Sequence, residues 1–184
     1  MKEIFLTLAL ITSFITMAQE EQKLPYYEIP EEAETYTAGT VASRMMDGLG
    51  FRYYWATEGL RAEDLSFKAS ESGRTSEETI DHILGLSNFI LNSISDTGIK
   101  SSEEVFTFEE KRIQTLLNIE KASNILKEID DLSKFDNDRF PFWNIINGPI
   151  SDALWHCGQV VMLRRASGNP FNSKASVFSG KVRE

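Results

Sequence analysis

The sequence predicts an all-α protein, a four-helix bundle with an N-terminal signal peptide and a short C-terminal tail. Four stretches place apolar side chains every three or four residues, the spacing of one helix face. Two of these stretches open with a capping box, and the last lies between Gly-Pro and Ser-Gly-Asn-Pro. No stretch alternates apolar and polar residues over more than four positions, so no strand is expected.

The composition fits one globular domain with a substantial core. The chain has 184 residues, of which 41% are hydrophobic and 26% are charged. Its net charge is −9 and its basic residues are not clustered, which argues against binding to nucleic acid or to an anionic membrane. The only cysteine is Cys157, so an intramolecular disulfide is excluded and the fold depends on its core.

Residues 1–18 are predicted to be a signal peptide. Their apolar run is shorter than the roughly 20 residues of a membrane-spanning helix. Thr16 and Ala18 are the small residues that signal peptidase requires for cleavage after Ala18. An uncleaved anchor and a buried first helix are the alternatives. Cleavage near Ala18 would leave a periplasmic or secreted protein without a stable membrane anchor.

Residues 19–36 are predicted to form an extended linker, because they are acidic and contain Pro25 and Pro30. The bundle is assigned to residues 37–170. Its first helix is predicted over about 38–60, where Gly48 and Gly50 weaken the helix and more often mark close helix–helix packing than a site.

The second helix begins at the capping box of Thr75 and Glu78. Its polar residues fall within an arc of roughly 100°, which leaves a broad apolar face for the interior. His82 lies within that apolar face. A histidine there is usually a packed core residue, and metal ligation is the alternative.

The third helix is predicted over about 107–131, again opening with a capping box, and Pro141 prevents a helix from running through the following turn. The fourth helix is predicted to start near Pro149 and to end near Ala166, before the Ser-Gly-Asn-Pro stop. Residues 171–184 are assigned to the tail, whose phenylalanines are expected to pack on the bundle.

Asp152 and His156 form the clearest pair of metal-ligand side chains. They are four residues apart, so they lie about 40° apart on one helix face, and Gln159 continues that face. His82 would complete a set of three if the second and fourth helices are neighbours. The helix dipole alone also favours an acid at Asp152, and His156 also fits a core histidine. Cys157 points about 100° away and is interpreted as a small buried hydrophobe.

The order of these parts resembles the DinB/YfiT-like family of metal-binding bundles. The similar segments are "FRYYWATEGLRAEDLSFK", "EETIDHILGLSNFIL" and "DALWHCGQVVMLRR", and the resemblance spans about residues 40–170. Those bundles have one histidine on the second helix and an H-x-x-x-H pair on the fourth, followed by x-G-Q. The resemblance implies that His82 and His156 are ligands. Asp152 stands where the family commonly has its other histidine, which makes the site less thiophilic.

The resemblance implies a divalent metal ion, a homodimer and a small-molecule substrate. Zinc is the leading ion, with nickel, iron and manganese as the others. Because a cytosolic thiol cosubstrate does not fit an exported chain, a metal-dependent hydrolase or transferase that polarises water or substrate is expected. The alternatives are a non-catalytic bundle that binds metal or a small ligand, and a structural bundle without a site.

Other residues are weaker candidates from the sequence alone. Glu58 is the only acid–base group proposed beyond the ligands. The residues proposed to line a pocket are aromatic or amide side chains of the first helix and of the stretch before the fourth: Tyr54, Trp55, Trp143, Asn144 and Asn147.

Overall fold

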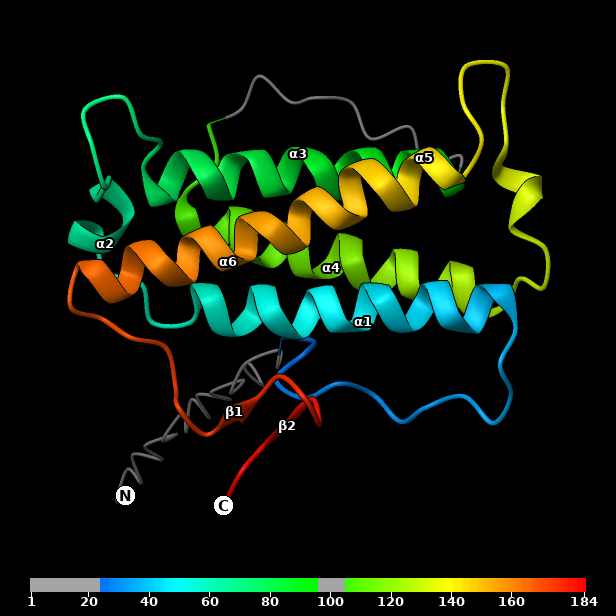
Figure 1. Ribbon diagram of the computed structural model, residues 1–184, viewed down its shortest axis with the longest axis horizontal. Helices are drawn as coiled ribbons and strands as arrows, with labels where there is room; N and C mark the ends of the chain where they lie inside the picture. Colours follow the sequence, from blue (N-terminus) through cyan, green and yellow to red (C-terminus); the bar gives the residue numbers. More distant parts are fainter. Residues whose placement is uncertain (1–23, 96–104) are drawn as a thin grey trace, which may run out of the picture.

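Four long helices packed as a bundle dominate the computed structural model, which describes residues 24–95 and 105–184 (Figure 1). They are α1 (Ala38–Thr57), α3 (Ser76–Ile94), α4 (Phe108–Lys127) and α6 (Ser151–Ala166). The predicted helical bundle is therefore confirmed in this part of the chain. The predicted signal peptide and most of the loop before α4 lie outside the described residues.

Each long helix packs against two others, so that α1, α4, α3 and α6 follow one another around the bundle. α3 and α6 are thus neighbours and run in opposite directions (Figure 1). The interior contains apolar side chains from all four helices, among them Met46, Leu49, Ile80, Ile83, Leu116, Ile119, Ala153 and Val160. Within the described residues, no helix is both long and apolar enough to cross a membrane.

Side-chain caps fix the starts of three long helices. The capping boxes of Thr75 with Glu78 and of Thr107 with Glu110 are both formed, as the sequence predicts. Thr37 caps α1 in the same way. These bonds satisfy amide groups that have no partner within the helix, so each helix begins at the residue after its cap.

The fourth helix starts earlier than predicted. A helical path begins with α5 (Trp143–Ile145), continues through the π-helix η2 (Ile146–Ile150), and runs into α6. Pro149 lies inside η2 and not at a helix start, so that prediction was wrong. Proline lacks an N–H and crowds the preceding turn of an α-helix, and the wider π turn accommodates it.

The connections also contain short elements that the sequence did not predict. α2 (Ala62–Ser66) lies between α1 and α3, and the 3-10 helix η1 (Leu132–Phe135) follows α4. The tail forms a two-stranded antiparallel hairpin of β1 (Ala175–Ser176) and β2 (Lys181–Val182), which corrects the strictly all-α prediction.

The segment before α1 is extended but packed. Tyr26 and Ile29 are buried, and the ring of Tyr26 lies where a side chain at Gly50 would otherwise be. Gly50 therefore makes room for this segment and not for another helix. The tail covers the same region: Ile29 donates a backbone hydrogen bond to Gly180. A second apolar cluster is formed here by Ile29, Phe51, Trp55 and Ala175. Phe171 packs against this second cluster as expected, whereas Phe178 is fully exposed.

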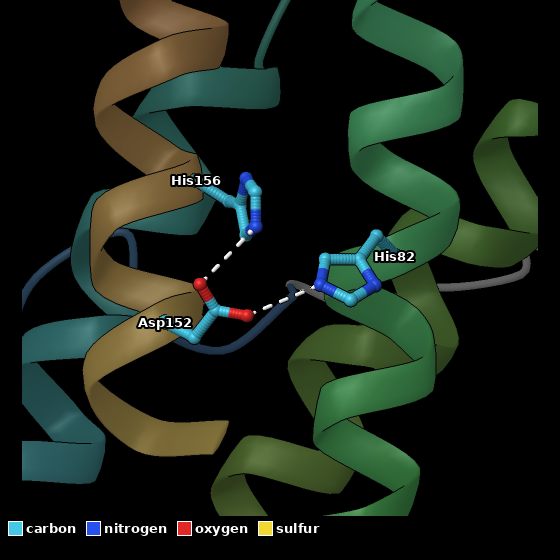
Figure 2. Close-up of side chains that lie close together, drawn as sticks. All are labelled: His82, Asp152 and His156. Carbon is cyan, nitrogen blue, oxygen red and sulfur yellow. Dashed lines mark hydrogen bonds and ion pairs between the residues drawn. The ribbon is translucent and has the colours of Figure 1, made fainter. Parts of the chain in front are cut away.

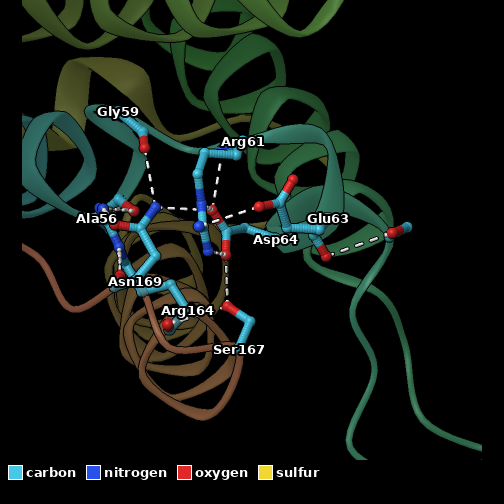
Figure 3. Close-up of polar contacts among 9 residues, drawn as sticks. Ala56, Gly59, Arg61, Glu63, Asp64, Arg164, Ser167 and Asn169 are labelled. Atoms are coloured by element: carbon cyan, nitrogen blue, oxygen red, sulfur yellow. Dashed lines mark hydrogen bonds and ion pairs between the residues drawn. The ribbon is translucent and has the colours of Figure 1, made fainter.

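A buried carboxylate joins α2 to the end of α6 (Figure 3). The side chain of Asp64 is fully buried and accepts hydrogen bonds from Arg61, Ser167 and Asn169. The Arg61 guanidinium, followed by Ser167 and Asn169, holds the pKa of this carboxyl well below its usual range. Arg164 is also buried and donates to the last carbonyls of α1. Together these bonds fix the end of α6 against α1 and α2.

Candidate metal centre

His82, Asp152 and His156 converge between α3 and α6 (Figure 2). Asp152 and His156 lie one turn apart on α6, and His82 faces them from α3. One Asp152 oxygen is 3.1 Å from Nε2 of His82, and the other is 3.3 Å from Nε2 of His156. The three residues that the sequence singled out therefore form one group, because α3 and α6 are neighbours.

The spacing of the donor atoms suits a single ion. The three candidate ligand atoms all lie within 4.8 Å of one another. Donors about 2.0–2.2 Å from one zinc ion are about 3–3.5 Å apart, close to the two separations measured from Asp152. The imidazole rings are perpendicular, with centroids 4.7 Å apart, and both turn Nε2 toward the carboxylate. This group could hold a metal ion.

Gln159 determines which nitrogen of His156 faces the carboxylate. Nδ1 of His156 lies 2.8 Å from Oε1 of Gln159, one turn further along α6. An amide oxygen accepts hydrogen bonds, so this arrangement suits an N–H at Nδ1 and leaves Nε2 as the nitrogen that faces Asp152. Nε2 lies 3.3 Å from a carboxylate oxygen, a separation that a shared cation or a proton on Nε2 bridges.

Gln159 is thus the acceptor that the sequence analysis did not assign. A bond from the far nitrogen of a ligating histidine to an oxygen acceptor is the usual way to fix its tautomer. The signal was present in the sequence, since Gln159 follows His156 by three residues and such pairs are neighbours on a helix.

The group is open on one side. The side chain of His156 is 11% exposed, whereas those of His82 and Asp152 are 38% and 40% exposed. No hydrogen bond from another described residue reaches Nδ1 of His82. Two imidazoles and one carboxylate with a solvent-facing side leave coordination positions for water or substrate, as catalytic sites do.

A depression of about 730 Å³ begins at His156 and is lined by residues of α6, by the start of α3 and by the loop before it. Among its lining side chains are Arg74, Thr79, Trp155, Gln159 and Met162. Its volume is within the range of small-molecule sites. A ligand in the depression would contact the ring of His156 directly.

None of the pocket residues proposed from the sequence lines this depression. Trp55 is buried in the second apolar cluster and donates to the carbonyl of Tyr27, and Tyr54 lies under the guanidinium of Arg112. Trp143 is exposed at the start of α5, which precedes η2 and α6. That prediction was wrong because these aromatic residues of α1 face the packed N-terminal segment, while α3 and α6 form the site.

The two remaining candidates also lie outside the group. Glu58 is paired with Arg112, which also donates to Thr57, so this carboxylate is engaged away from the histidines. Burial raises the pKa of the Cys157 thiol to about 12, so the residue is a neutral thiol at physiological pH. Cys157 is therefore a small buried hydrophobe, as the sequence predicts, and is not a member of the ligand group.

Comparison of the chain with family models, with curated proteins and with solved structures finds no match. The family resemblance therefore remains a proposal. The geometry of the chain establishes a helical bundle in which His82, Asp152 and His156 form a group of metal-ligand side chains.

Proposed function

We propose that this chain is an exported metal protein of the DinB/YfiT-like type, in which His82, Asp152 and His156 hold one divalent ion. Zinc suits two imidazoles and a carboxylate with an open position. Iron also takes this donor set, and nickel and manganese are further candidates. The homodimer implied by the resemblance belongs to the same proposal, and light scattering of the purified protein measures it.

The observation that carries the proposal is the arrangement of Asp152 between the two imidazoles. Nδ1 of His156 is bonded to Gln159, so Nε2 faces one carboxylate oxygen, and Nε2 of His82 lies against the other. These two imidazole nitrogens and the carboxylate are the donors that would hold a divalent ion. The carboxylate would also offset half of the charge of the ion.

The chemistry that follows is that of a hydrolase or transferase acting on a small molecule. A divalent ion in this site acts as a Lewis acid that polarises a bound oxygen. Gln159 orients His156, and the depression gives a substrate room beside His156. Asp152 would serve as a ligand and not as a free base, because both of its oxygens face histidines.

A non-catalytic bundle that binds metal or a small ligand is the second candidate. No carboxylate is among the described side chains that line the depression, and Glu58 is paired elsewhere. A hydrolase needs a group that moves protons within hydrogen-bond reach of the substrate. The described residues that line the depression offer none beside His156, and this observation favours the binding role.

Turnover separates the two candidates. Metal-loaded wild type and His156→Ala are compared on panels of carboxylic esters, phosphoric esters, amides and thiol acceptors. An enzyme turns over at least one panel member, loses that activity in His156→Ala and on chelation, and regains it in wild type when the ion is restored. If the protein retains its ion but turns over no member, the enzymatic proposal fails and the binding role stands.

A further inference from the structure

Arg74 is an exposed cation on the depression that borders the candidate metal group. It lines the depression that begins at His156, and it is the only acidic or basic side chain among the described lining residues apart from His156. Within the described residues it makes no hydrogen bond or ion pair through its side chain. The Glu78 carboxylate interacts with Arg74 through space, but its hydrogen bonds go to Thr75, and Glu77 pairs with Lys111. A chain of net charge −9 thus presents an exposed cation here that has no direct ion pair among the described residues.

The wall of the depression on α6 is apolar and exposed. Trp155 is 73% exposed and Met162 is 65% exposed. They are seven residues apart, so they lie on the same helix face, two turns apart. Gly158 lies between them, and its position faces open space, with no atom within 4 Å of where a Cβ would be. Because glycine has no side chain, the surface between Trp155 and Met162 stays uncovered.

Arg74 and Met162 lie on the same side of the metal group. Arg74 precedes His82 by eight residues, close to the start of α3, and Met162 follows His156 by six. Because α3 and α6 are antiparallel, both steps lead toward the end of the bundle where α6 ends (Figure 1). At 1.5 Å per residue they correspond to roughly 9–12 Å along the helices. The depression therefore extends from His156 along an apolar wall toward Arg74, and His82 and Asp152 adjoin its His156 end.

We propose that the ligand of this site is an elongated organic anion. Its metal-binding group lies at His82, Asp152 and His156, its apolar middle packs on Trp155 and Met162, and its carboxylate or phosphate pairs with Arg74. Arginine recognises both anions through its planar fork of N–H donors. This inference rests on the proposed metal site and adds the class of ligand.

The test measures the binding of three probes that differ only in the chemical group at one end. Suberic acid monohydroxamate carries a chelating group and a carboxylate, and its carboxamide and phosphonate analogues replace that carboxylate. Calorimetry compares them on zinc-loaded wild type, Arg74→Gln and Arg139→Gln. Arg139 is the control because it is an exposed arginine in the turn after η1, outside this depression.

Wild type should bind the anionic probes about fivefold more tightly than the carboxamide at low ionic strength, the scale of an exposed ion pair. This preference should disappear in Arg74→Gln, persist in Arg139→Gln and weaken in high salt. The tighter of the two anionic probes identifies the head group. Equal binding of all three probes to wild type, or a preference that survives in Arg74→Gln, overturns the inference.

Two non-chelating compounds keep the result independent of the metal. Octanoate and octanamide are titrated while the fluorescence of Trp155 is followed, with Trp155→Phe as the blank. An Arg74-dependent preference for octanoate supports the anion subsite even if the protein holds no ion, and equal quenching by both compounds contradicts it. Absence of bound zinc, together with weak binding of every hydroxamate, refutes the proposed metal site alone.

Discussion

Removal of the Asp64 carboxylate should destabilise the protein more than any change of a surface acid. Asp64 is fully buried and accepts bonds from the main chain and guanidinium of Arg61, from Ser167 and from Asn169. A hydrogen bond contributes about 1 kcal/mol, and one to a charged group contributes more. Arg61 is half-exposed and can be hydrated again, so its share is reduced. We expect Asp64→Ala to lower the free energy of unfolding by about 3 kcal/mol.

Urea denaturation followed by circular dichroism measures this loss, and thermal denaturation should show a Tm lower by about 6–12 °C. Asp64→Asn retains the shape and one acceptor oxygen, so it should lose roughly half as much. Asp138→Ala, an exposed acid in the turn after η1, should change the free energy by less than about 0.5 kcal/mol. If Asp64→Ala is as stable as Asp138→Ala, the junction does not fix α6 as we infer.

The same carboxylate gives a dependence on pH. Its native pKa is depressed chiefly by Arg61, so the unfolded chain takes up a proton at a higher pH than the native protein does. The stabilisation is therefore complete above the ordinary carboxyl pKa of about 3.9 and is lost as the pH falls through the lower native value. The difference in stability between wild type and Asp64→Asn should be smaller at pH 3 than at pH 7.

Three further predictions concern single positions. Gly39→Ala should destabilise the protein strongly, because its Cβ would lie 1.8 Å from a backbone oxygen after α4. Gly85→Ala meets open space within α3 and should stabilise the protein by up to about 1 kcal/mol. Urea denaturation measures both changes. Gln159→Leu should weaken metal binding about 10- to 100-fold in a chelator competition, because it frees the His156 ring, and unchanged affinity would exclude this role. Protein recovered from the periplasm or medium should begin at Gln19 by intact mass, and a full-length chain in the cytosol would contradict export.

Local chemistry in the sequence was sufficient for the starts of α3 and α4. Thr75 and Thr107 are each followed three residues later by glutamate, and both boxes form because they need only atoms within one turn. The same kind of rule failed at Pro149. The local sequence around Pro149 fits both a helix start and the inside of a π turn. Only the packing of the preceding turn decides between these two structures.

The site was predictable to the extent that it depends on helix spacing. Asp152 and His156 share a face because they are four residues apart, but His82 joins them only because α3 and α6 are neighbours. Periodicity identifies the buried face of each helix and not the helix that it meets. Arg74 shows the same limit: it precedes a cap and follows a loop, and no local pattern indicates that it borders the depression.

Metal stoichiometry tests most directly whether His82, Asp152 and His156 bind one divalent ion. Wild type, His82→Ala, His156→Ala and Asp152→Ala are purified without chelators, supplied with zinc, nickel, iron and manganese, and analysed for bound metal.

Wild type should bind about one ion per chain, either histidine variant should lose most of its metal, and Asp152→Ala should bind metal more weakly. Asp152→His should retain zinc or nickel, because imidazole suits both ions. Affinity should fall with acid as protons compete for the ligands. Equal metal content in wild type and both histidine variants, or none in wild type, would contradict the account. The Gln159 amide would then be turned to donate to His156, and the histidines would simply hydrogen-bond Asp152.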